Sequence, residues 1–115
     1  MLQKITPLLL LFLGETLSIG AELVGSKRAA EVGSYASTFF VMLPIVILGG
    51  ALLVGGYMLG YTQFKNIWIV TALSVGSILI VEPFLAFVLF HQTPTLGAGI
   101  GLCLGALGIA ATLFL

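Results

Sequence analysis

The sequence predicts an all-α membrane protein that crosses the bilayer four times within 115 residues. Hydrophobic residues make up 60% of the chain, charged residues only 7%, and the mean hydropathy is +1.27. A soluble domain carries roughly a quarter charged residues. The length allows about four spans of ~20 residues joined by short links. Because backbone groups in lipid must be satisfied internally and no alternating barrel pattern is present, we expect helices throughout a single domain, residues 1–115.

The first helix is predicted over residues 5–25, just before the basic pair Lys27 and Arg28. Lys4 followed by a leucine-rich run also resembles the start of a cleaved signal peptide. However, Glu15 interrupts the apolar run, and the segment is long enough to span a bilayer. We therefore expect a retained helix.

The later helices are predicted over residues 35–60, 67–90 and 96–115, separated by short polar or small-residue links. Aromatic residues of the kind that form interfacial belts lie near the predicted helix ends. These are Tyr35, Tyr57, Tyr61 and Trp68. The links are short, so neighbouring helices should run antiparallel.

The basic residues give no preferred orientation. Alternation places Lys4 and Lys65 on one side of the membrane and Lys27 and Arg28 on the other. The positive-inside rule is therefore balanced. Either a partner or the insertion machinery decides the orientation, or the chain inserts both ways and pairs as an antiparallel dimer.

Glycines in the last predicted helix follow a helical spacing: Gly97, Gly101, Gly105 and Gly108. Glycine weakens a helix by about 1 kcal/mol relative to alanine, so the stripe needs a reason. Small residues at this spacing let helix backbones approach closely in lipid. We expect the stripe to contact either a second copy or another helix of the same chain.

Glutamates inside the apolar segments are the strongest functional signal. Glu15, Ser18 and Glu22 share one face of the first helix, which predicts a hydrated groove. A charged residue near the bilayer centre costs at least ~2.5–3.5 kcal/mol and usually marks a transport path. Low dielectric disfavours the charged carboxyl, so one glutamate can hold either a proton or a cation. The alternative is a protonated glutamate that only joins two helices.

The third helix carries a second set of candidates, Thr71, Ser74 and Glu82, which we predict to bind substrate or protons with the first-helix set. Pro83 follows Glu82 and frees a backbone carbonyl one turn earlier. A kink beside an acid supplies local polarity, although packing alone also explains proline in spanning helices.

No enzymatic, metal or cofactor chemistry is predicted. The chain has no aspartate, one histidine and one cysteine, and it lacks phosphate-binding and metal-ligand motifs. Cys103 in its apolar run is expected to pack, and His91 to lie in a turn. The zero net charge gives no reason to expect a nucleic-acid partner.

The segment around the third link is similar to the last helix pair of the drug/metabolite transporter superfamily. Its four-helix small multidrug resistance branch is nearest in size, and a half-size EamA-like member is the other possibility. The residues that keep the family spacing are Gln92, Thr95, Gly101 and Gly108, with Gly76 upstream. Thr71 and Ser74 replace aromatic residues of multidrug members, so the resemblance does not imply multidrug specificity.

The resemblance implies four helices per chain, an antiparallel dual-topology dimer and proton-coupled export through a first-helix glutamate, here Glu15 by depth. We therefore expect a transporter that exchanges protons for a small cationic or polar metabolite by alternating access, as a homodimer or a heterodimer with a paralogue. Alternatives are a half-size subunit that moves a lipid-linked sugar and a non-transporting membrane assembly subunit. A prokaryotic inner membrane is the expected location.

Overall fold

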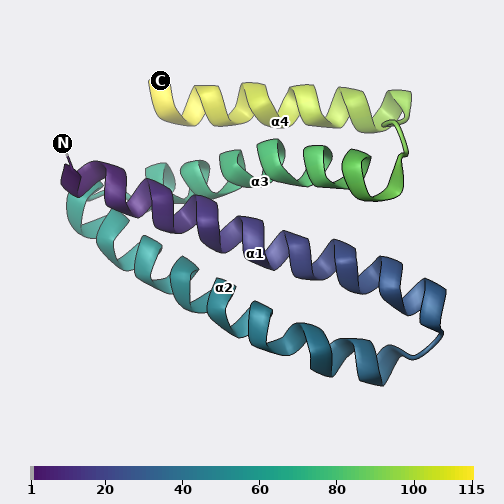
Figure 1. Cartoon of the computed structure of the whole chain (residues 1–115). Coiled ribbons are helices and arrows are strands. Elements are labelled where there is room, and N and C mark those ends of the chain that lie inside the picture. Colours follow the sequence, from purple (N-terminus) through teal and green to yellow (C-terminus); the bar gives the residue numbers. More distant parts are fainter. Residues whose placement is uncertain (1) are drawn as a thin grey trace.

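The computed structural model describes residues 2–115, which form four α-helices (Figure 1). These are α1 (Leu2–Val32), α2 (Tyr35–Phe64), α3 (Ile67–Phe90) and α4 (Leu96–Phe114). Each helix is long and apolar enough to cross a membrane. The predicted all-α fold and the four predicted helices of spanning length are confirmed, and their length and hydropathy suggest a multi-pass membrane protein.

The first helix is longer than predicted, with 31 residues rather than the range 5–25. Residues 29–32, expected in a link, continue the helix, because the stretch after the apolar run is rich in alanine, lysine, arginine and glutamate, which favour helices in water. Gly33 ends α1 with a positive φ of 77°. Its N–H donates to the Ala29 carbonyl at 2.8 Å, which satisfies one carbonyl of the last turn.

The remaining helices begin at the predicted residues, and only α2 extends further, to Phe64 rather than residue 60. Side chains cap two of the starts: Asn66 accepts from the Trp68 N–H at 3.0 Å, and Thr95 accepts from the Ala98 N–H at 3.1 Å. Lys65 and His91 end α2 and α3 in the left-handed conformation. Polar links with capping residues therefore mark these boundaries well.

The helices form a thin, open bundle with α1 at its centre (Figure 1). Helix α1 packs against α2 and α3, while among the described residues α4 packs only against α3. The Cα extents are 45 × 34 × 18 Å. The best-buried side chains, Pro7, Leu11 and Val70, come from α1 and α3. The core therefore lies along α1, and α4 forms one edge.

Glycines bring α1 and α2 close together. A Cβ on Gly49 would lie 2.7 Å from Ser18 Oγ and 3.2 Å from the Gly14 carbonyl oxygen, so the two backbones approach where Gly14 and Gly49 meet. A Cβ on Gly56 would likewise lie 2.9 Å from the Leu11 side chain. Close approach of this kind is the expected use of small residues in spanning helices.

The predicted glycine stripe of α4 is used differently. A Cβ on Gly105 would lie 3.2 Å from the Leu79 side chain of α3, but one on Gly97, Gly101 or Gly108 would meet nothing within 4 Å. No residue of α4 is buried. Packing within the chain therefore accounts for Gly105, and contact of the other three glycines with a second copy stays a prediction.

Candidate functional site

Glu15 lies near the middle of α1 and is only 9% exposed. Ser74 Oγ of α3 donates a hydrogen bond to Glu15 Oε1 at 2.6 Å. Leu11 and Ile19, one turn before and after Glu15, are also buried. The structure thus places one carboxyl and one hydroxyl in contact within the apolar packing between α1 and α3.

The second carboxyl oxygen of Glu15, Oε2, can still accept a hydrogen bond. Ser74 is the only partner described for Glu15. Within the described part of the chain, no completely buried side-chain oxygen or nitrogen lacks a hydrogen bond. Glu15 Oε2 therefore retains some exposed surface, where it can carry a proton or contact a water molecule or a cation.

The other predicted residues of the first-helix face do not join this contact. Ser18 Oγ lies where a Cβ on Gly49 would be crowded, so Ser18 faces α2 rather than α3. Glu22 is exposed and lines a cavity of about 660 Å³ between α1 and α2, together with Tyr35 and Thr38. In this structure the three residues therefore meet different neighbours, and none of the described cavities joins them. The hydrated groove shared by Glu15, Ser18 and Glu22 stays a prediction.

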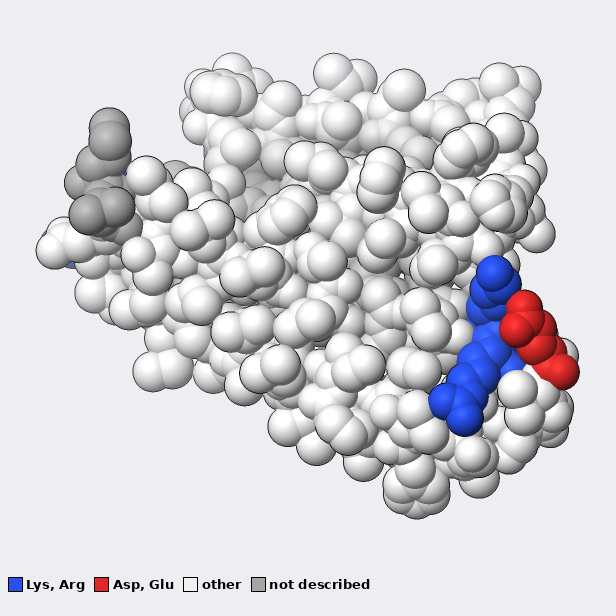
Figure 2. Space-filling view, in the orientation of Figure 1, with Lys and Arg blue, Asp and Glu red and all other residues white. Residues whose placement is uncertain are grey.

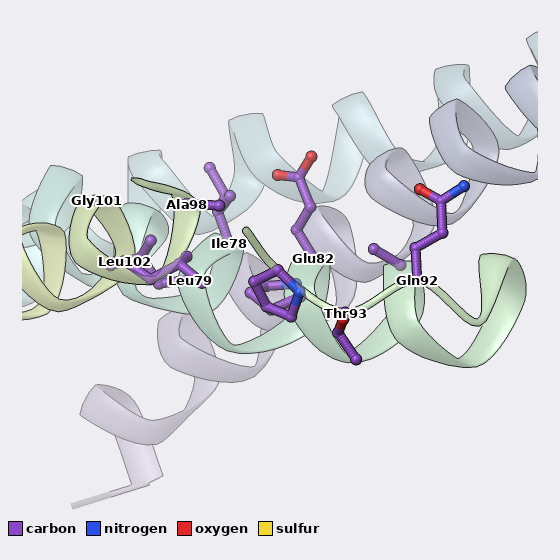
Figure 3. A pocket seen from close by; sticks show the side chains of 11 residues that line it. Ile78, Leu79, Glu82, Gln92, Thr93, Ala98, Gly101 and Leu102 are labelled. Carbon is purple, nitrogen blue, oxygen red and sulfur yellow. The ribbon is translucent and has the colours of Figure 1, made fainter. Parts of the chain in front are cut away.

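The third-helix candidates are also divided. Ser74 is buried against Glu15, and Thr71 is half-buried. Glu82 is exposed and lines a cavity of about 450 Å³ between α3 and α4, together with Gln92 (Figure 3). None of the five cavities that we describe is lined by Glu15. The three spanning glutamates thus occupy three separate environments.

Sequence reasoning missed a contact made by Lys27, which lies beyond the end predicted for the first helix. Lys27 Nζ donates to the Leu89 carbonyl oxygen at 3.0 Å, near the end of α3. A cation at a helix C-terminus offsets the partial negative charge of the last carbonyls. The available signal was topology: α1 and α3 run parallel, so their C-terminal ends lie on one side of the bundle.

Charge gathers where α1 ends. Figure 2 shows blue and red side chains together at one end of a surface that is otherwise almost uncharged. The charged residues of this end of α1 are Lys27, Arg28 and Glu31. The C-terminal end of α1 is therefore a charged end of the bundle, and the hydrogen bond of Lys27 joins it to α3.

No protein-family model matches the chain, and no curated protein or solved structure is significantly similar to it. The similarity to drug/metabolite transporters therefore stays a prediction from the residues quoted above. The candidate site rests on its own geometry, a buried carboxyl that joins two spanning helices.

Proposed function

We propose that the chain is a small transporter that exchanges protons for a small cationic or polar metabolite at Glu15, by alternating access in a dimer. The observation that supports the proposal is the hydrogen bond between Ser74 and a buried carboxyl close to the middle of α1. Ionisable groups at this depth are costly and usually functional. A prokaryotic inner membrane is the location that we propose.

Competition for one carboxyl is the proposed coupling step. With a proton bound, Glu15 is neutral and is compatible with the apolar packing between α1 and α3. Without the proton, the carboxylate needs a positive charge beside it, which a cationic substrate supplies. Proton and substrate then exclude each other at Glu15, and binding of one releases the other.

Entry of a metabolite to Glu15 requires the contact between α1 and α3 to open, because Glu15 is only 9% exposed and lines none of the described cavities. Helices α1 and α2 are held by close glycine contacts and would move together. Among the described residues α4 packs only on α3 and would follow it, so opening would separate α3 from α1 and from α2, which α3 also contacts. Rocking of one helix pair against the other about a site near the midplane is a recurrent transport mechanism.

A dimer supplies what one chain lacks. A bundle only 18 Å thick in its smallest Cα dimension offers few walls to separate a polar pathway from lipid. A second copy, or a paralogue, placed over the central helices would close such a pathway. The balanced basic residues are compatible with an antiparallel pair.

The test is proton release from purified protein on addition of small organic cations, choline and putrescine among them, in weakly buffered detergent solution. Glu15→Gln keeps the size of the side chain and an oxygen for Ser74 but removes the acidic group. We expect release from the wild type and from Glu31→Gln, a matched change at the exposed end of α1, but none from Glu15→Gln. Equal release from all three proteins would refute the role of Glu15.

A non-transporting membrane assembly subunit is the second candidate. It is favoured by the position of Glu15, which is bonded to Ser74 and lines none of the described cavities. In that case the carboxyl is a protonated interhelical contact, and no cation releases protons from the wild type. The same titration therefore separates the two candidates.

A further inference from the structure

The cavity between α3 and α4 contains polar groups that the exchange at Glu15 does not use. Its polar lining comes from Glu82 on α3 and from Gln92 and Thr93 in the link, and its apolar wall includes Ile78 and Leu102. Its volume is about 450 Å³. Because α4 packs only on α3 within residues 2–115, this cavity lies at the edge of the bundle, away from the contact between α1 and α3.

Glu82 has no hydrogen bond or ion pair among the described residues. The chain has four basic residues. Lys27 donates to the Leu89 carbonyl, while Lys4 lies 6.0 Å from the centre of the Phe64 ring, at the opposite end of the bundle. Lys65 follows α2 at that same opposite end. Arg28, near the end of α1, has no described contact with Glu82. The charge that would balance Glu82 is therefore not supplied by a described contact of this chain.

The depth of Glu82 makes this lack of a partner costly. Glu82 lies eight residues before Phe90, the last residue of α3, which is about 12 Å along the helix axis. Helix α3 has 24 residues and is about 36 Å long, against a hydrocarbon core of about 30 Å. The carboxyl is thus inside the apolar layer, where an ionised group needs a cation or water.

The geometry around Glu82 indicates what a ligand would have to offer. Figure 3 shows the carboxyl of Glu82 and the amide of Gln92 extending in the same direction from α3 and the link. A carboxylate accepts hydrogen bonds only, and an amide oxygen accepts two more. The aliphatic side chains beside them favour an apolar body. The cavity therefore suits a molecule with a strong N–H donor at one end and an aliphatic chain at the other.

We propose that this cavity binds a primary ammonium group carried by an aliphatic molecule, with Glu82 as the counter-ion and Gln92 as a second acceptor. The ammonium comes either from a lipid headgroup or from a soluble aliphatic amine. The site is separate from Glu15 and does not depend on the proposed exchange. A primary ammonium has three donors for these acceptors, whereas a quaternary ammonium has none.

The first test is calorimetric titration of the full chain in phosphatidylcholine nanodiscs with hexylamine, hexanol and hexyltrimethylammonium. We expect hexylamine to bind and the other two to bind at least tenfold more weakly. Glu82→Gln should lose at least tenfold in hexylamine affinity, while Glu31→Gln should bind as the wild type does. Equal binding of hexanol, or unchanged binding by Glu82→Gln, would overturn the proposal.

A second variant separates this site from the exchange site. If hexylamine affinity is lost in Glu15→Gln and kept in Glu82→Gln, the amine binds at Glu15, which overturns this proposal and supports the proposed function. If it is lost only in Glu82→Gln, the site at α3 and α4 holds whatever the outcome of the proton-release test. Equal melting temperatures of the two variants and the wild type are the folding control.

Lipid is the other source to test. Native mass spectrometry of protein from mixed phosphatidylethanolamine and phosphatidylcholine bilayers measures which lipid is retained. Preferential retention of phosphatidylethanolamine by the wild type but not by Glu82→Gln assigns the site to a lipid headgroup. Loss of hexylamine binding in Glu82→Gln, without a lipid preference in the wild type, assigns it to a soluble amine. If neither effect is observed, the cavity is not an ammonium site.

Discussion

Glu15 and Glu82 are both glutamates inside apolar helices, but they differ in burial and in hydrogen bonding. Glu15, on the central helix α1, is buried and hydrogen-bonded to Ser74. Glu82, beside the edge helix α4, is exposed to a cavity and has no described partner. The difference arises from packing: α1 contacts two helices at close range, whereas α4 covers only α3. A glutamate in an apolar helix therefore has a free-energy cost wherever it lies. The packing of the neighbouring helices decides whether a hydrogen bond within the chain offsets that cost.

The largest expected effect comes from the close contact of the central helices. Gly49→Val adds a branched side chain where even a Cβ would lie 2.7 Å from Ser18 Oγ and 3.2 Å from a backbone oxygen. Overpacking of this kind typically costs about 1–3 kcal/mol. We expect that loss in the free energy of unfolding, measured by denaturant titration in detergent micelles.

Gly97→Ala on the edge helix is the matched control, because a Cβ there meets nothing within 4 Å. Its free energy of unfolding should not fall, since alanine favours a helix by up to about 1 kcal/mol relative to glycine. Similar losses in both variants would show that the centre and the edge of the bundle are equally well packed, contrary to the closer packing of α1 and α2.

The second effect concerns the two glutamates directly. Glu15→Ala leaves the buried hydroxyl of Ser74 without its acceptor, and an unsatisfied buried group costs about 1–3 kcal/mol. Glu82→Ala removes a carboxyl that has no described partner and should be neutral or stabilising. The measurement is again the free energy of unfolding in micelles, for both variants side by side. An equal loss, or a larger one at Glu82, would contradict the assigned environments.

A third, smaller effect is expected at the end of α3. Lys27→Met removes the donor to the Leu89 carbonyl oxygen, which lies 3.0 Å from Nζ, while it keeps much of the aliphatic chain. A net hydrogen bond contributes about 0.5–1.5 kcal/mol. Amide hydrogen exchange should therefore accelerate in the last turn of α3. Arg28→Met, for which no comparable contact is described, should leave exchange there unchanged, and equal acceleration in both would argue against the contact.

The fold could be predicted well from the sequence, because the lengths of the apolar segments and the polar links between them mark where the helices lie. Helices α2, α3 and α4 start where predicted, since the residues before them, including Asn66 and Thr95, are good capping residues. The end of α1 was missed because helix propensity continues beyond the apolar run as far as Gly33. Span length says nothing of how far a helix projects into water.

The site was only partly predictable. Glu15 and Ser74 were both named from the sequence, but their pairing depends on which face of α1 meets α3, and helical periodicity alone cannot supply that. Ser18 and Glu22 share a face with Glu15, yet they face α2 and a separate cavity. In a chain that is apolar on all sides, side chains give little information on which neighbour each face will meet.

The smallest loss of folding stability is expected at the glycines of α4 that touch nothing among the described residues. Replacing Gly97 and Gly108 together by alanine should not lower the free energy of unfolding, since neither Cβ would meet an atom within 4 Å and alanine favours a helix by up to about 1 kcal/mol relative to glycine. If the stripe is a contact between copies, the same pair should weaken self-association, measured by energy transfer between labelled copies as lipid dilutes them. Unchanged self-association would mean that a dimer uses another face. The proposed transport pathway would require that face to be the surface over α1 and α3 near Glu15.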